Sequence, residues 1–180
     1  MLATDISATG CLSSWVNGVA SFGTFIKSST ATWDINGVDG IPSGWIIKNE
    51  DGSYPQSACL CFTSAGDSTV RMEQYGTPNT SANKVIQYKL NAGEWQAWDL
   101  SAIALTAGDK MYIKSDDEIP ISESNQIYKK FVMTGSIAAS GNIMSLLNFS
   151  TTLADYVFFR LFEGCTSLTQ APVLPATTLA

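Results

Sequence analysis

Residues 84–100 read KVIQYKLNAGEWQAWDL, and this stretch decides the fold class. Ile86, Tyr88 and Leu90 take every second position, with polar side chains among the positions between them. A period of two is the pattern of a β-strand that turns one face to a core. Residues 91–94 (Asn-Ala-Gly-Glu) then supply a Gly-containing loop before a second extended run. The stretch therefore predicts a β-hairpin.

Short runs of the same type lie on both sides of this hairpin. Residues 57–63 and 69–75 flank a Gly-Asp turn, and we expect the second run to be the return strand of the first. Two further strands are predicted at 110–114 and 127–134. Short strands at this spacing, separated by Gly and Asn, indicate a β-sandwich domain over residues 56–147.

The two tryptophans of the hairpin's second strand are Trp95 and Trp98. They lie three positions apart, so they face opposite sides of an extended chain. We expect one of them in the core. The other either stacks on a sugar or a neighbouring chain, or also packs within the sandwich.

Residues 1–55 form a separate, loop-rich region with frequent Gly. Asn17-Gly18 is a tight-turn signal, and we expect short strands around it at 12–16 and 19–27. The tryptophans of this region either pack in a small core or form a docking face, since Trp is enriched at interface hot spots. The interface candidates are Trp15, Phe22, Phe25, Trp33 and Trp45.

Residues 162–180 read FEGCTSLTQAPVLPATTLA and have the form of one solenoid repeat unit. Before them, residues 152–162 place apolar side chains three and four positions apart, which predicts a short amphipathic helix that ends at Gly164. One unit cannot bury its own apolar face, and about three are usually needed. We therefore expect either that further units follow or that this unit leans on the domain before it. Its predicted core, in a C-terminal region of residues 148–180, is Leu161, Phe162, Cys165, Leu168, Leu174 and Leu179.

The composition favours binding over catalysis. The chain has no His, which removes the commonest general base and the commonest metal ligand. The net charge of −6 and the sequence pI of about 4.4 argue against nucleic-acid binding, because no basic patch can neutralise phosphates. The acidic run at 116–118 lacks the spacing of a calcium loop. We expect no enzyme activity, no metal and no cofactor.

The four cysteines are Cys11, Cys59, Cys61 and Cys165. Cys59 and Cys61 share one face of the predicted strand, and their spacing differs from that of a zinc or redox motif. Buried thiols are the favoured interpretation, with a disulfide or a metal site as alternatives.

The first ten residues lack both a basic and an apolar segment, so they predict no secretory signal. The sequence also holds no apolar run of the ~18 residues that a membrane span needs. We expect a protein that is made in a cytoplasm and is not inserted in a membrane.

The run from Tyr156 through FEGCTSL (162–168) to Ala180 closely resembles the repeat of BspA-like leucine-rich-repeat surface proteins of gut and oral anaerobic bacteria. A weaker likeness extends the match over roughly residues 84–180. The resemblance implies a leucine-rich repeat at 148–180, and it implies adhesion or ligand binding in place of catalysis. Family members on bacterial surfaces begin with a signal peptide, and this sequence departs from them there.

The N-terminal stretches at 21–27 and 40–47 are similar to N-terminal segments of phage fibre and appendage proteins of the same bacteria. Together the two resemblances imply a mainly β phage virion protein, a head or tail fibre or decoration subunit. Its expected partners are other capsid or tail proteins, further copies of itself (often trimers in such fibres), and a host-surface glycan or protein. The alternatives are an exported BspA-like adhesin on the bacterial cell surface and a carbohydrate-binding accessory module.

Overall fold

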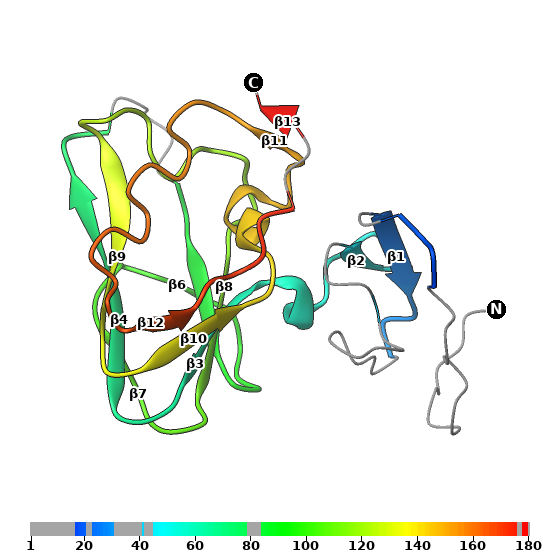
Figure 1. Ribbon diagram of the computed structural model, residues 1–180, viewed down its shortest axis with the longest axis horizontal. Coiled ribbons are helices and arrows are strands. Elements are labelled where there is room, and N and C mark those ends of the chain that lie inside the picture. Colours follow the sequence, from blue (N-terminus) through cyan, green and yellow to red (C-terminus); the bar gives the residue numbers. More distant parts are fainter. Residues whose placement is uncertain are drawn as a thin grey trace. The chain divides into compact units, whose positions relative to one another are not determined.

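The computed structural model divides the chain into two compact units, Met1–Ala58 and Cys59–Ala180 (Figure 1). It describes residues 17–20, 23–30, 41, 45–78, 84–175 and 178–179, the last two by their backbone alone. Among these residues the regular structure is strand, apart from two short 3-10 helices, so the protein is mainly β. Each unit is considered by itself below.

The first unit is built on a parallel pair of strands, β1 (Gly23–Lys27) and β2 (Trp45–Asn49), followed by the 3-10 turn η1 (Gln56–Ala58). Ile41, Ile47 and Ala58 are its buried aliphatic residues in the described part of the chain. Of the strand expected at 19–27, the structure shows Gly23–Lys27 as a strand, residues 19 and 20 are not in a strand, and residues 21 and 22 lie outside the described residues. The strand expected at 12–16 lies outside the described residues.

The second unit holds a six-stranded and a three-stranded sheet. The six-stranded sheet has the order β12-β10-β3-β8-β5-β6, and the three-stranded sheet has the order β7-β4-β9. Every pair within them is antiparallel except β10 with β12. The strands are β3 (Leu60–Ser64), β4 (Ser68–Tyr75), β5 (Gln87–Leu90), β6 (Gln96–Ala97), β7 (Ile103–Leu105), β8 (Lys110–Lys114), β9 (Tyr128–Thr134), β10 (Ile137–Ser140) and β12 (Leu168–Gln170).

The chain crosses between the two sheets at almost every turn, because β3, β5, β8 and β10 belong to one sheet and β4, β7 and β9 to the other. The hairpin predicted at residues 91–94 is confirmed, since β5 pairs with β6. The return strand predicted for β3 is wrong, because β3 pairs with β8 and β10 and not with β4. The turn after Ser64 instead passes the chain to the opposite sheet.

One apolar core joins the two sheets. Phe62 of β3 and Phe131 of β9 come from opposite sheets, and their ring centroids lie 5.0 Å apart in an edge-to-face arrangement. Trp98 is 6% exposed and stacks on Phe131 at 6.3 Å, so it is the tryptophan of the hairpin that enters the core. Trp95 is half-buried, with the Lys114 ammonium 5.1 Å from its ring centroid.

The amphipathic helix predicted at 152–162 is wrong. Residues 155–164 instead form a series of single turns, in which Tyr156 (φ 59°) and Arg160 (φ 55°) take left-handed backbone conformations that an α-helix excludes. The carbonyl oxygen of Val157, which a helix over 152–162 would pair with the Leu161 N–H, accepts a hydrogen bond from the Ser122 N–H at 3.2 Å. Another segment of the unit therefore takes a backbone group that the helix needs.

The second 3-10 helix, η2 (Ile143–Leu147), follows β10. The Asn142 side chain accepts a hydrogen bond from the Met144 N–H at 2.8 Å and caps its start. All five residues of η2 are buried, so this helix belongs to the core. None of the helices in the described part of the chain is long and apolar enough to cross a membrane.

Candidate functional site

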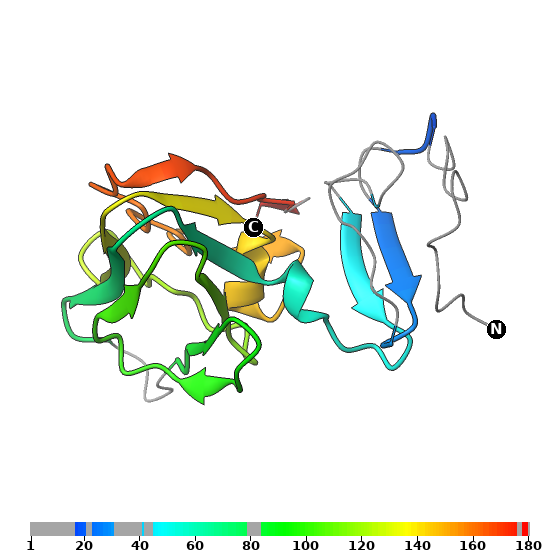
Figure 2. The same cartoon turned by 90° about the horizontal axis from the view of Figure 1, so that it is seen from below.

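The C-terminal coil, residues 154–179, stacks in parallel on the segment that precedes it. Strand β12 pairs in parallel with β10, and β13 (Thr178–Leu179) pairs in parallel with β11 (Thr152–Leu153). Between the two pairs, Asn142 and Val173 form a parallel bridge. Figures 1 and 2 show β10 beside β12 from two directions. Segments that run in the same direction and stack strand on strand have the geometry of successive coils of a solenoid.

The sequence carries a signal for this stacking that the periodicity analysis missed. The tetrapeptide Thr-Thr-Leu-Ala occurs at 151–154 and again at 177–180, a spacing of 26 residues. The structure pairs the two copies in register, with Thr152 opposite Thr178 and Leu153 opposite Leu179. A search for internal repeats finds this recurrence from the sequence alone.

Gly141 lets the chain after β10 lie close against Cys59. Its φ is +70°, and a Cβ at this position would overlap the carbonyl oxygen of Cys59. Its own carbonyl oxygen accepts a hydrogen bond from the Val173 N–H at 2.9 Å. Only Gly combines this backbone conformation with so close an approach of two segments of the chain.

The residues predicted for the core of the repeat unit occupy different environments. Leu161 is 2% exposed and lies in the main core, and Phe162, Cys165 and Leu168 are half-buried and pack against it. Leu174 is 53% exposed. The side chain of Leu179 lies outside the described residues.

The coil ends the six-stranded sheet, because β12 is its edge strand. Val173 and Leu174 follow this strand and are 38% and 53% exposed. A sheet edge with exposed aliphatic side chains beside it can accept another strand. The coil therefore buries one of its faces on the domain and leaves an edge accessible within the second unit.

Four aromatic rings join the coil to the three-stranded sheet. Tyr75 of β4 stacks on Tyr128 of β9 with ring centroids 4.8 Å apart and planes 8° apart. Tyr128 meets Phe159 of the coil edge-to-face at 5.6 Å, and Phe159 meets Tyr156 in the same way at 5.7 Å. We call Tyr75, Tyr128, Phe159 and Tyr156 the aromatic strip. Its two ends are the most exposed members, Tyr75 at 36% and Tyr156 at 48%.

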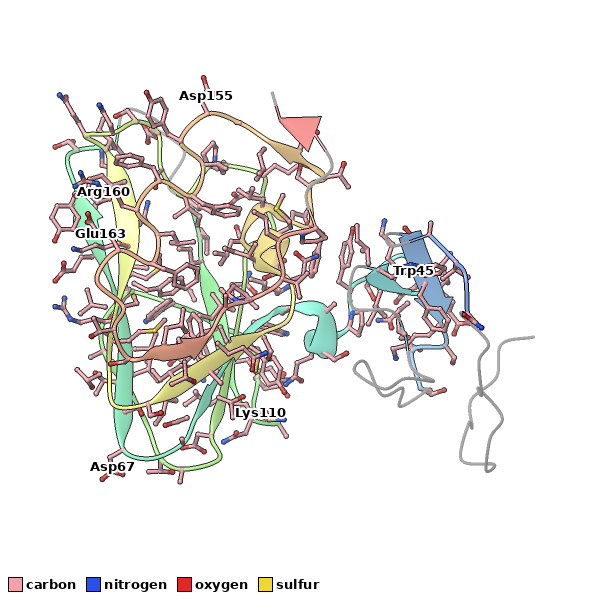
Figure 3. The ribbon with its side chains drawn as sticks, in the orientation of Figure 1. Trp45, Asp67, Lys110, Asp155, Arg160 and Glu163 are labelled. Atoms are coloured by element: carbon pink, nitrogen blue, oxygen red, sulfur yellow. The ribbon has the colours of Figure 1, made fainter. Side chains whose placement is uncertain are left out.

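Charged side chains of both signs border the aromatic strip. The Arg160 guanidinium lies 5.7 Å from the Tyr128 ring centroid, and the Lys130 ammonium lies 5.2 Å from that of Tyr75. Glu163 pairs with both cations, at 3.5 Å from Arg160 and 3.7 Å from Lys130. Figure 3 shows Arg160 and Glu163 close together beside β4 and β9.

Glu73 adds a second carboxylate at the Tyr75 end of the strip. It accepts a hydrogen bond from the Tyr75 hydroxyl at 2.7 Å and pairs with Arg71 at 2.6 Å. The Tyr75 hydroxyl and the Arg71 guanidinium lower the pKa of Glu73, and Glu73 in turn raises the pKa of Tyr75. The carboxylate is thus held ionised and fixed in place.

The interface candidates of the first unit fall into two groups. Phe25 and Trp45 lie on the paired strands β1 and β2 and are half-buried. The Trp45 indole N–H donates to the Ala20 carbonyl oxygen at 2.9 Å. Trp15, Phe22 and Trp33 lie outside the described residues.

Two residues of the acidic run at 116–118 form ion pairs with lysines. The Lys114 ammonium lies 2.6 Å from Asp116, and that of Lys84 lies 2.9 Å from Asp117. The Lys84 side chain is only 2% exposed, and this burial lowers its pKa although Asp117 acts in the opposite sense. Among the described residues, no three His, Cys, Asp or Glu side chains come together as metal ligands.

The described cysteines are thiols. Cys59 and Cys61 are buried and lie on one face of the chain at β3, and burial raises the pKa of Cys59 to about 12. The half-buried Cys165 donates its S–H to the Phe131 carbonyl oxygen at 3.2 Å.

Comparison with protein-family models, with curated proteins and with solved structures found no match to this chain.

Proposed function

We propose that this chain is a binding and display protein whose C-terminal coil begins a parallel solenoid of leucine-rich type. The observation that carries the proposal is the in-register stacking of Thr178–Leu179 on Thr152–Leu153, two copies of one motif. A strand that stacks on an identical strand one coil earlier presents the same kind of edge to the next coil. Stacking can then continue without a change of geometry, which is how repeat proteins build extended binding surfaces.

The exposed edge of the coil supports the same proposal. Val173 and Leu174 are the exposed aliphatic residues that a following coil would cover. In an array each coil buries such residues of the coil before it, whereas a closed domain leaves few of them at a sheet edge. This accounts for a Leu at position 174 that the second unit leaves 53% exposed.

The proposed setting is a phage virion, in a head or tail fibre or decoration subunit. The first unit would dock on other capsid or tail proteins, and Phe25 and Trp45 are the described residues proposed for that contact. Self-association would multiply weak contacts to a host-surface glycan or protein. The resemblance of residues 21–27 and 40–47 to phage appendage proteins supports this setting. The resemblance of the coil itself equally supports an exported adhesin on a bacterial surface.

Extension of the chain by one and two further copies of residues 155–180 tests the solenoid. Each added copy places a Thr-Thr-Leu-Ala motif 26 residues after the last one. We expect the urea midpoint of the second unit to rise with each copy, because every coil covers the edge of the one before. A matched extension with the same residues in scrambled order should give no rise. Equal midpoints for the two extensions would refute the solenoid.

Association of the protein tests the proposed setting separately. Light scattering of the purified chain should give a homo-oligomer, and the protein should co-purify with virus particles from infected cells. A monomer that is found only on the surface of uninfected bacteria would favour the exported adhesin and exclude the virion.

A further inference from the structure

The aromatic strip crosses the three-stranded sheet onto the C-terminal coil and forms a continuous chain of rings. Its neighbouring centroids lie 4.8, 5.6 and 5.7 Å apart, so each ring contacts the next. The two inner rings are the least exposed, whereas Tyr75 and Tyr156 are 36% and 48% exposed. Packing on the sheet explains the inner rings. It does not explain Tyr156, which leaves about half of its surface exposed although it meets Phe159 edge-to-face.

The backbone at the coil end of the strip is in a conformation that stability alone would not select. Tyr156 has a φ of 59° and Arg160 a φ of 55°, and both side chains are exposed. A left-handed conformation is unfavourable for any residue with a Cβ. Gly would remove this cost at either position. Side chains retained at strained and exposed positions are typical of a ligand surface.

The charged groups along the strip form a network with both donors and acceptors. Glu163 is shared by Lys130 and Arg160, and Glu73 is shared by Arg71 and the Tyr75 hydroxyl. Three cations thus lie beside two carboxylates, and each of the three cations forms an ion pair with one of them. Such a border presents N–H donors and carboxylate acceptors side by side, without a strong field of either sign.

We propose that the aromatic strip binds a carbohydrate chain, with Tyr156 as the stacking residue and with Arg160 and Glu163 as the groups that recognise hydroxyls. A sugar ring offers an apolar C–H face to an aromatic ring, and each hydroxyl both donates and accepts hydrogen bonds. A polyanion would meet the two carboxylates of the border with unfavourable charge, and a polycation would meet its three cations. The proposal rests on the proposed function of surface adhesion and adds to it the ligand class and its site.

The test is binding of the intact chain to an array of neutral and acidic bacterial oligosaccharides, followed by titration calorimetry with each oligosaccharide that binds. We expect Tyr156→Ala to weaken binding about tenfold or more, and Tyr156→Phe to retain it, because the ring carries the stacking. Glu163→Gln should weaken binding without a loss of the ring contacts. The control is Tyr54→Ala in the first unit, a tyrosine outside the aromatic strip whose ring centroid lies 5.1 Å from the Lys48 ammonium.

A wild-type chain that binds no oligosaccharide on the array would overturn the proposal, and so would equal binding by wild type and Tyr156→Ala. Melting curves of each variant separate loss of binding from loss of fold. Sedimentation at several concentrations tests a second copy as occupant, and loss of self-association in Tyr156→Ala would assign the strip to an interface. These outcomes are independent of the coil-extension experiment, so the glycan site can fail while the solenoid stands.

Discussion

Ser145 is the residue whose replacement tests the architecture of the second unit most directly. It lies in η2 with no exposed surface, and its hydroxyl joins two neighbouring strands. The Oγ donates to the Ile113 carbonyl oxygen of β8 at 2.8 Å and accepts from the Leu60 N–H of β3 at 3.0 Å. Leu60 and Ile113 are themselves opposite each other in the sheet and fully buried. A single hydroxyl therefore satisfies backbone groups of two strands at once.

The Ser145→Ala variant removes the hydroxyl and leaves the Leu60 N–H without its hydrogen bond in a site closed to water. A buried polar group that loses its partner costs about 1–3 kcal/mol, and the lost bond to the Ile113 carbonyl adds to this. We expect the free energy of unfolding to fall by about 2–4 kcal/mol. For a chain of this size the melting temperature should fall by roughly 10 °C.

Urea denaturation followed by circular dichroism gives the free energy, with Ser150→Ala as the matched control. Ser150 is half-buried, and its hydroxyl makes two long local contacts: it donates to the Thr152 carbonyl oxygen at 3.4 Å and accepts from the Thr152 N–H at 3.3 Å. The control should lose less than about 0.5 kcal/mol. If Ser145→Ala is as stable as Ser150→Ala, the hydroxyl does not link η2 to the sheet and the reasoning is wrong.

Three other perturbations have expected outcomes. Gly141→Ala should destabilise the chain by about 3 kcal/mol or more, because the added Cβ would overlap the Cys59 carbonyl oxygen and the φ at this position is positive. The control Gly66→Ala should melt like the wild type, because a Cβ at position 66 would lie in open space. Asp117→Asn should cost about 1–3 kcal/mol at pH 7 by leaving the Lys84 ammonium without its ion pair. Burial holds the pKa of Lys84 below its ordinary 10.5, so in the folded wild type Lys84 loses its charge, and with it the ion pair, as the pH rises toward 10.5. The stability difference between wild type and Asp117→Asn should therefore shrink over this range, and a difference that stays constant with pH would contradict the reasoning. With a thiol pKa of about 12, Cys59 should resist iodoacetamide at pH 8 in the native chain and react after unfolding. Mass spectrometry measures the labelling, and rapid labelling of the native chain would show that Cys59 is accessible.

The candidate site could be predicted from the sequence only in part. Leu161 was correctly placed in the core, because apolar residues of a terminal coil have to pack on the domain before it. The helix predicted around it was wrong, because apolar residues three and four positions apart also suit a coil of single turns. The aromatic strip was not predicted at all. It unites Tyr75 with Tyr156, and no local pattern connects residues so far apart in the chain.

Three local features can be derived from the amino-acid sequence without the fold: the strand class, the hairpin at 91–94 and the motif that recurs at 151–154 and 177–180. These follow from short-range physics, since side-chain alternation, turn chemistry and repetition are properties of neighbouring residues. Only the folded chain shows which strands pair, places β3 between β8 and β10, and gives the Val157 carbonyl oxygen to the Ser122 N–H in place of a helical bond. Strand partners are chosen by burying one shared core, and that choice depends on all the strands together.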